Sequence, residues 1–91
     1  MTKSVHGTQY RRFLRLLVKT RESCGMTQVE VARAIGRPQS FVSKAESGER
    51  RLDVAELLQL LSAMQVDPLQ FVGALLPSSA EAGRRRRVEP R

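Results

Sequence analysis

Four polar side chains on one short predicted helix have the chemistry to read the edges of DNA bases. A glutamine amide forms two hydrogen bonds with adenine, a lysine ammonium donates to O6 or N7 of guanine, and a serine hydroxyl contacts bases with weak discrimination. A protein core has no use for such a face, so the pattern indicates either base contact or a solvated helix surface. The four residues are Gln39, Ser40, Ser43 and Lys44.

The helix that carries these side chains is the second of two short helices expected within residues 26–48. Thr27 and Glu30 have the capping-box spacing that starts the first helix. Gly36 ends it, because glycine adopts the left-handed conformation without a Cβ penalty. Apolar residues recur between these limits with helical period, and we expect this stripe to face the core. It consists of Val29, Ala32 and Ile35, with Val31 beside them.

The second helix of the pair begins close after the turn. Pro38 suits its first turn, where a missing N–H costs nothing, and Gly48 closes it after about Ser47. Two short helices joined by a tight turn are the layout that places one helix in the major groove of DNA. The apolar residues of the second helix are Phe41, Val42 and Ala45.

Three further helices are expected around this pair. The first spans about residues 8–23 and stops at Gly25. The fourth starts at Asp53, with Glu56 three places later, and the fifth starts at Asp67-Pro68 by similar capping chemistry. No strand pattern is present, so the fold class predicted is all-α.

Each of these three helices has an apolar face of helical period. In the first helix the face consists of Tyr10, Phe13, Leu14, Leu17 and Val18, and Arg21 lies on the same side. In the fourth helix it consists of Val54, Leu57, Leu58, Leu61 and Met64, with Leu60 beside it. The fifth helix is apolar over much of its surface, through Leu69, Phe71, Val72, Leu75 and Leu76.

From about Tyr10 to Leu76 the chain resembles the phage Cro and lambda-repressor type of helix-turn-helix regulators, often called XRE-like. The resemblance implies a five-helix lambda-repressor-like DNA-binding domain whose second and third helices form the helix-turn-helix. It rests on an arginine seven residues before the glutamine of a TQ pair, then an alanine, a glycine and a helix ending in E-x-G. These residues are Arg21, Thr27-Gln28, Ala32, Gly36, Glu46 and Gly48.

The resemblance also implies roles for particular side chains. The third helix would enter the major groove, with Gln39, Ser40, Ser43 and Lys44 at base edges. Contacts with the phosphate backbone position a protein without reading sequence. For the arginines, the alternative is surface charge for solubility. The residues expected at phosphates are Gln28, Arg37, Arg50 and Arg51.

Two charged residues are expected to have a structural role. In the resembling proteins the residues at the positions of Arg21 and Glu46 pair between the first and third helices. A carboxylate close to the base-reading face would repel phosphate unless it were neutralised, and pairing with Arg21 would neutralise it.

The fifth helix is the candidate dimer interface. Its apolar residues are more than one side of a short helix needs to bury, and an exposed apolar patch usually marks an interface. The resemblance favours a two-fold dimer, because one recognition helix reads only a few base pairs. The alternative is that these residues complete the core. They are Leu69, Phe71, Val72, Leu75 and Leu76.

The charge of the chain suits a polyanionic partner. The 91 residues carry a formal net charge of +7 and have a pI of about 11.1. We expect a flexible N-terminus at residues 1–9, one DNA-binding domain at 10–77 and a basic, disordered tail at 78–91. The run Arg84–Arg87 is interpreted as an electrostatic arm for DNA, a solubilising tail or an anchor for an acidic partner.

Several other kinds of protein are disfavoured. Cys24 is the only cysteine, so we expect no internal disulfide. Cys24 and His6 together are too few ligands for a tetrahedral metal site. No phosphate-binding glycine loop and no nucleophile with a base is recognisable, so we expect neither an enzyme nor a cofactor. No signal peptide or membrane span is evident, which favours a cytoplasmic protein.

The function predicted is therefore a sequence-specific regulator of transcription that binds double-stranded DNA as a homodimer on a palindromic operator. A repressor or a controller of a restriction-modification system would fit the short chain. The main alternative is an antitoxin-like module that binds a protein partner through the fifth helix or the Arg-rich tail, with DNA binding secondary. A second alternative is a nucleoid or RNA binder driven by charge alone.

Overall fold

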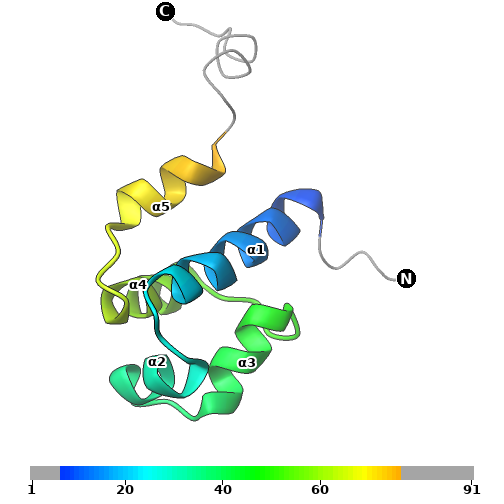
Figure 1. Ribbon diagram of the computed structural model, residues 1–91. Coiled ribbons are helices and arrows are strands. Elements are labelled where there is room, and N and C mark those ends of the chain that lie inside the picture. The colour runs from blue at the N-terminus through cyan, green and yellow to red at the C-terminus, as the bar shows by residue number, and fades with distance from the viewer. Residues whose placement is uncertain (1–6, 77–91) are drawn as a thin grey trace, which may run out of the picture.

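Five helices form the part of the chain that the computed structural model describes, residues 7–76. In Figure 1, α2 and α3 lie together at one end of the molecule, α1 runs diagonally across the middle, and α5 lies at the other end. Within residues 7–76 there is no strand, so the predicted all-α, five-helix fold is confirmed. The helices are α1 (Thr8–Ser23), α2 (Gln28–Ile35), α3 (Gln39–Ser47), α4 (Val54–Ala63) and α5 (Pro68–Leu75).

The capping residues read from the sequence start their helices as expected. Thr27 and Glu30 form a reciprocal box, in which the Thr27 Oγ1 accepts from the Glu30 N–H at 3.0 Å and the Glu30 Oε1 accepts from the Thr27 N–H at 2.9 Å. Asp53 and Glu56 repeat this arrangement at α4. Asp67 caps α5. Each box satisfies backbone donors that a helix cannot satisfy itself.

Pro38 differs by one position from the prediction. It is the N-cap of α3 and not a residue of the first turn, because its ψ of 153° is extended while its carbonyl already accepts from the Phe41 N–H at 2.9 Å. The fixed φ of proline suits both positions, so the sequence did not distinguish them.

Glycines end both helices of the central pair. Gly36 follows α2 with a φ of 69° and Gly48 follows α3 with a φ of 85°, both in the left-handed region. The turn of the helix-turn-helix therefore depends on a backbone conformation that other L-residues adopt with strain.

Replacing Gly36 with alanine is expected to lower the free energy of unfolding by about 1 kcal/mol. A Cβ at this position meets no atom within 4 Å, so the cost is backbone strain alone. Gly73→Ala is the matched control, since Gly73 lies inside α5 with equal space around it and should gain stability. Urea unfolding measures both, and equal effects would contradict the assignment of strain to Gly36.

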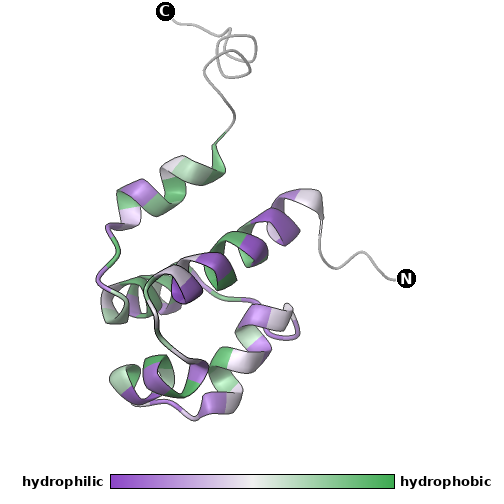
Figure 2. Ribbon diagram, in the orientation of Figure 1, coloured by the Kyte–Doolittle hydropathy of each residue, from purple (hydrophilic) through white to green (hydrophobic). Residues whose placement is uncertain are grey.

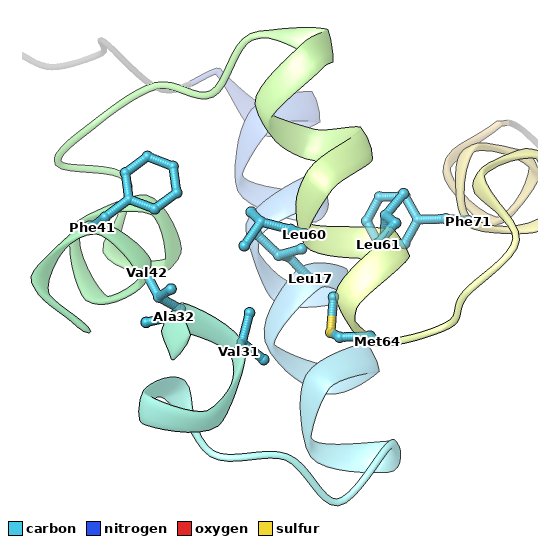
Figure 3. Close-up of a cluster of buried hydrophobic side chains, with 9 residues drawn as sticks. All are labelled: Leu17, Val31, Ala32, Phe41, Val42, Leu60, Leu61, Met64 and Phe71. Carbon is cyan, nitrogen blue, oxygen red and sulfur yellow. The ribbon is translucent and has the colours of Figure 1, made fainter. Parts of the chain in front are cut away.

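A single cluster of buried side chains joins all five helices (Figure 3). From α1, Phe13 packs edge-on against Phe71 of α5, with ring centroids 5.9 Å apart and planes at 88°. One face of α2 and one face of α3 pack against the cluster, and their other faces are exposed to solvent. It consists of Leu17, Val31, Ala32, Phe41, Val42, Leu60, Leu61, Met64 and Phe71.

The predicted apolar stripes of α2 and α4 are partly wrong. Val29, Leu58 and Val54 are exposed, Val54 to 72%, while Val31 and Leu60 are in the core. A helix of eight to ten residues offers several apolar stripes, and its neighbours decide which one is buried. Here α2 packs against both α3 and α4, which turns Val31 inward.

Candidate nucleic-acid interface

The outer face of α3 presents the polar residues that the sequence predicted for base contact. Gln39, Ser40 and Lys44 are exposed, and Ser43 is half-buried. The opposite face anchors the helix, because Phe41, Val42 and Ala45 are buried in the core. The structure thus brings three of the four predicted base-reading side chains fully onto one accessible helix surface, with Ser43 at its edge.

A chain of hydrogen bonds runs from α1 to the first residue of α3. Arg21 holds Glu46 through two bonds, from Nε to Oε2 at 2.6 Å and from Nη2 to Oε1 at 3.0 Å. The Glu46 Oε1 also accepts from the Gln28 Nε2 at 2.9 Å, and the Gln28 Oε1 accepts from the Gln39 Nε2 at 2.7 Å. A third bond joins the Arg21 Nη1 to the Met26 carbonyl at 2.9 Å. The polar residues of three helices therefore hold one another in place.

The predicted pairing of Arg21 with Glu46 is present as a forked ion pair. The two side chains are only 14% and 7% exposed. The hydrogen bonds to Glu46 raise the pKa of Arg21 above its ordinary value, although its burial acts in the opposite direction. Arg21 therefore stays charged and neutralises the one acidic residue of the Arg21-to-Gln39 chain.

Gln28 and Gln39 keep hydrogen-bonding groups available after forming this chain. An amide NH2 has two donor hydrogens and an amide oxygen has two lone pairs. Gln39 uses one donor, so its second N–H and its oxygen remain for a ligand. Gln28 uses one donor as well, and the first-turn N–H groups of α2 have no partner within the helix.

Arginines in the two connecting segments stack on aromatic rings. The Arg37 Cζ lies 3.8 Å from the centroid of the Phe41 ring, and the Arg50 Cζ lies 5.2 Å from the same centroid. The Arg51 Cζ lies 4.3 Å from the Tyr10 ring. Arg50 also forms an ion pair with Glu56. The sequence predicted these arginines near DNA but did not predict the stacking, because Arg37 and Arg50 lie in connections outside α3 and Arg51 is far from Tyr10 in the chain.

The segment between α3 and α4 is tied to its neighbours by backbone groups. The Arg50 N–H donates to the Lys44 carbonyl at 3.1 Å. The Leu52 N–H donates to the Tyr10 hydroxyl at 3.2 Å, which fixes the segment to α1. The basic side chains of this segment are therefore presented from an ordered connection beside α3.

Comparison with known proteins gives the family. A family model described as helix-turn-helix matches residues 17–71. The chain belongs to this helix-turn-helix family, of the XRE type. Members of the family are DNA-binding transcription regulators and not enzymes, so the general class of this chain is a DNA-binding regulator.

Solved structures share the helix-turn-helix fold. An XRE-family like protein from Pseudomonas syringae pv. tomato str. DC3000 is 45% identical, over 74% of this chain and 82% of that one, with a TM-score of 0.71. The wild-type restriction-modification controller protein C.Esp1396I is 21% identical over 77% of this chain and 90% of its own, with a TM-score of 0.71. Among curated proteins, no sequence matches this chain significantly.

A further solved neighbour of this helix-turn-helix chain contains DNA. It is the C.Esp1396I tetramer in complex with its natural 35 base-pair operator, 21% identical over 77% of this chain and 92% of that one, with a TM-score of 0.71. At that identity the likeness establishes the fold alone.

The predicted dimer surface on α5 of the helix-turn-helix domain needs one correction. Phe71 is 3% exposed and belongs to the core, because it packs against Phe13 of α1. Leu75 is half-buried. Leu69, at 82% exposure, Val72 and Leu76 remain on the surface. Figure 2 shows apolar residues along most of this helix.

Residues 7–76 of the helix-turn-helix domain contain neither a metal-binding group of side chains nor a membrane-spanning helix. Among residues 7–76 no group of His, Cys, Asp and Glu side chains could hold a metal ion. No helix of the described part is long and apolar enough to span a membrane. His6 and the run Arg84–Arg87 lie outside the described residues, as do residues 1–6 of the predicted N-terminus and all of the predicted tail.

Proposed function

We propose that this protein is a sequence-specific transcription regulator of the repressor or controller type, which inserts α3 into the major groove of double-stranded DNA. The observation that supports this most is the position of Gln39. Its side chain is exposed on α3, is held by Gln28, and keeps one donor and its acceptor oxygen available. That pair of groups matches N7 and N6 of adenine.

Ser40, Ser43 and Lys44 complete the proposed reading face. Lys44 is exposed one turn along α3 from Ser40 and donates to guanine O6 or N7 in this proposal. The serines are short and accept or donate, so they adjust the fit more than they select a base. Glu46 does not join this face, since its carboxylate accepts from both Arg21 and Gln28.

The start of α2 is the proposed anchor on the phosphate backbone. Gln28 retains one amide donor, and the first-turn N–H groups of α2 and the helix dipole attract an anion. Arg37, Arg50 and Arg51 would contact further phosphates from the connections before and after α3. Arg37 has no acidic partner within the described residues, whereas Arg50 already faces Glu56.

A homodimer formed through α5 is the proposed assembly. Leu69, Val72 and Leu76 expose apolar surface on the helix that lies farthest from α2 and α3 in Figure 1. Two reading helices joined through this surface would contact half-sites about one helical turn apart. The controller protein C.Esp1396I, which has the same fold, is seen as a tetramer on its operator.

Replacing Val72 with glutamate is expected to convert the dimer to a monomer at micromolar concentration, because a charge would be buried in an apolar interface. Val29→Glu is the matched control, since Val29 has similar exposure on α2, away from α5. Sedimentation equilibrium measures both. A monomeric native protein would contradict the dimer, and would favour a different protein as the partner of α5.

The proposed function is tested by selecting bound sites from random duplex DNA with the purified protein at about 150 mM salt. Enrichment of a palindrome with half-sites about 34 Å apart would support the sequence-specific dimer. Strong retention without enrichment would contradict it and indicate binding through charge alone.

A further inference from the structure

Phe41 of α3 is shared by two arginines that come from different connecting segments. Arg37 precedes α3 and Arg50 follows it, yet their guanidinium carbons lie 3.8 Å and 5.2 Å from the centroid of one ring. Arg37 lies in the connection before α3 and is half-buried. One aromatic ring thus joins the turn before the recognition helix to the connection after it.

The place of Phe41 in the core leaves the ring available for this contact. Figure 3 shows Phe41 at the margin of the buried cluster, apart from Leu17 and Leu60 at its centre. An aliphatic side chain of similar volume would also fill that margin. What only an aromatic ring provides there is a negative π face for a cation.

Stacking suits an arginine that must also bind phosphate. The ring contacts the flat face of the guanidinium, and its N–H donors lie around the edge, so they stay available for phosphate oxygens. An arginine that is already ordered loses less conformational entropy when it binds. Arg50 is ordered further by its ion pair with Glu56 and by the bond from its N–H to the Lys44 carbonyl.

We propose that Phe41 is a positioning residue that holds Arg37 and Arg50 in place for the DNA backbone on the two sides of the recognition helix. Both phosphate contacts then depend on one buried ring that itself touches no DNA. This inference rests on the proposed function for its effect on binding, but the stacking itself exists in the free protein and is measurable there.

The first test uses Phe41→Leu, which keeps apolar volume and removes the π face, and Phe41→Tyr, which keeps the ring. Phe41→Leu is expected to weaken binding to the selected operator about five- to tenfold, because two arginines that the ring no longer orders must then be ordered on binding, and Phe41→Tyr should bind as the native protein does. Binding is measured well below each variant's Tm, so that partial unfolding of a less stable variant does not lower the measured affinity.

A thermodynamic cycle separates positioning from a general effect on α3. In the Arg37→Ala, Arg50→Ala background the arginines are absent, so Phe41→Leu should cause no further loss of affinity. An undiminished loss in that background would overturn the inference. If the native protein bound every duplex equally, the proposed sequence-specific function would be wrong. The same cycle, measured with non-specific DNA, would still test whether Phe41 positions the two arginines.

A second test needs no DNA. In the native protein the Hδ resonances of Arg37 and Arg50 should be shifted upfield by the ring, and both shifts should vanish in Phe41→Leu and persist in Phe41→Tyr. Shifts that are the same in Phe41→Leu as in the native protein would overturn the stacking whatever DNA the protein binds.

Discussion

Replacing Arg21 with alanine is expected to lower the free energy of unfolding by about 2–3 kcal/mol, because it leaves the Glu46 carboxylate without its cationic partner. Glu46 is 7% exposed, so water replaces little of what is lost. The bond from Arg21 to the Met26 carbonyl is lost as well, which loosens the connection to α2. For a domain of this size, Tm should fall by about 10 °C.

Two variants serve as controls for the loss of Arg21. Arg15→Ala makes the same substitution at an exposed position of the same helix, and should change stability by less than about 0.5 kcal/mol. Arg21→Lys keeps the charge but cannot form the forked pair, so its stability should lie between those of the native protein and Arg21→Ala. An Arg21→Ala protein as stable as Arg15→Ala would show that the ion pair contributes nothing to the fold.

The Arg21→Ala variant also separates two roles of the hydrogen bonds that run from Arg21 to Gln39, which are stability of the fold and DNA binding. When Arg21 is absent, Glu46 regains an unneutralised charge beside the proposed DNA surface, and Gln28 loses a fixed partner. Operator binding should therefore weaken even at temperatures where the variant is fully folded. Unchanged affinity in the folded variant would confine Arg21 to stability.

The helix limits and the ion pair were predictable because each depends on residues that act locally or match a known pattern. Thr27 with Glu30 and Asp53 with Glu56 are boxes closed within four residues, so the sequence alone determines them. Gly36 requires no neighbour to end α2. Arg21 and Glu46 are 25 positions apart, and only the family resemblance predicted their pairing.

The features that the sequence did not predict depend on packing between helices. Val54 is exposed although Leu61 and Met64 of the same apolar stripe are in the core, and it is the first residue of α4. Phe71 is in the core and not on the dimer surface, because Phe13 lies across from it. The stacking of Arg37 on Phe41 has a short separation in the chain, but it depends on the rotation of α3, which the turn geometry sets.

Replacing Gln39 with alanine is expected to weaken binding to the selected operator about tenfold per half-site, and about a hundredfold for a dimer on two half-sites, since a bidentate contact with a base contributes roughly 1–3 kcal/mol. The loss should be restricted to sequences that carry the preferred base at one position of each half-site. The stability of the protein should barely change, because the side chain is exposed and its one bond, to Gln28, is at the surface.

The matched control for Gln39 is Gln59→Ala, which removes the same amide from an exposed position of α4 and should leave binding unchanged. Competition with a panel of operators, each altered at one base pair, then distinguishes two readings of Gln39. If it reads a base, the variant loses its preference at one position and keeps the others. If it contacts only the backbone, affinity falls uniformly over the panel and the preference survives, which would contradict the proposed adenine contact.

The additional variant Gln28→Ala tests whether Gln28 supports Gln39. Without Gln28 the Gln39 amide is no longer held, so the base preference at that same position should weaken together with the overall affinity.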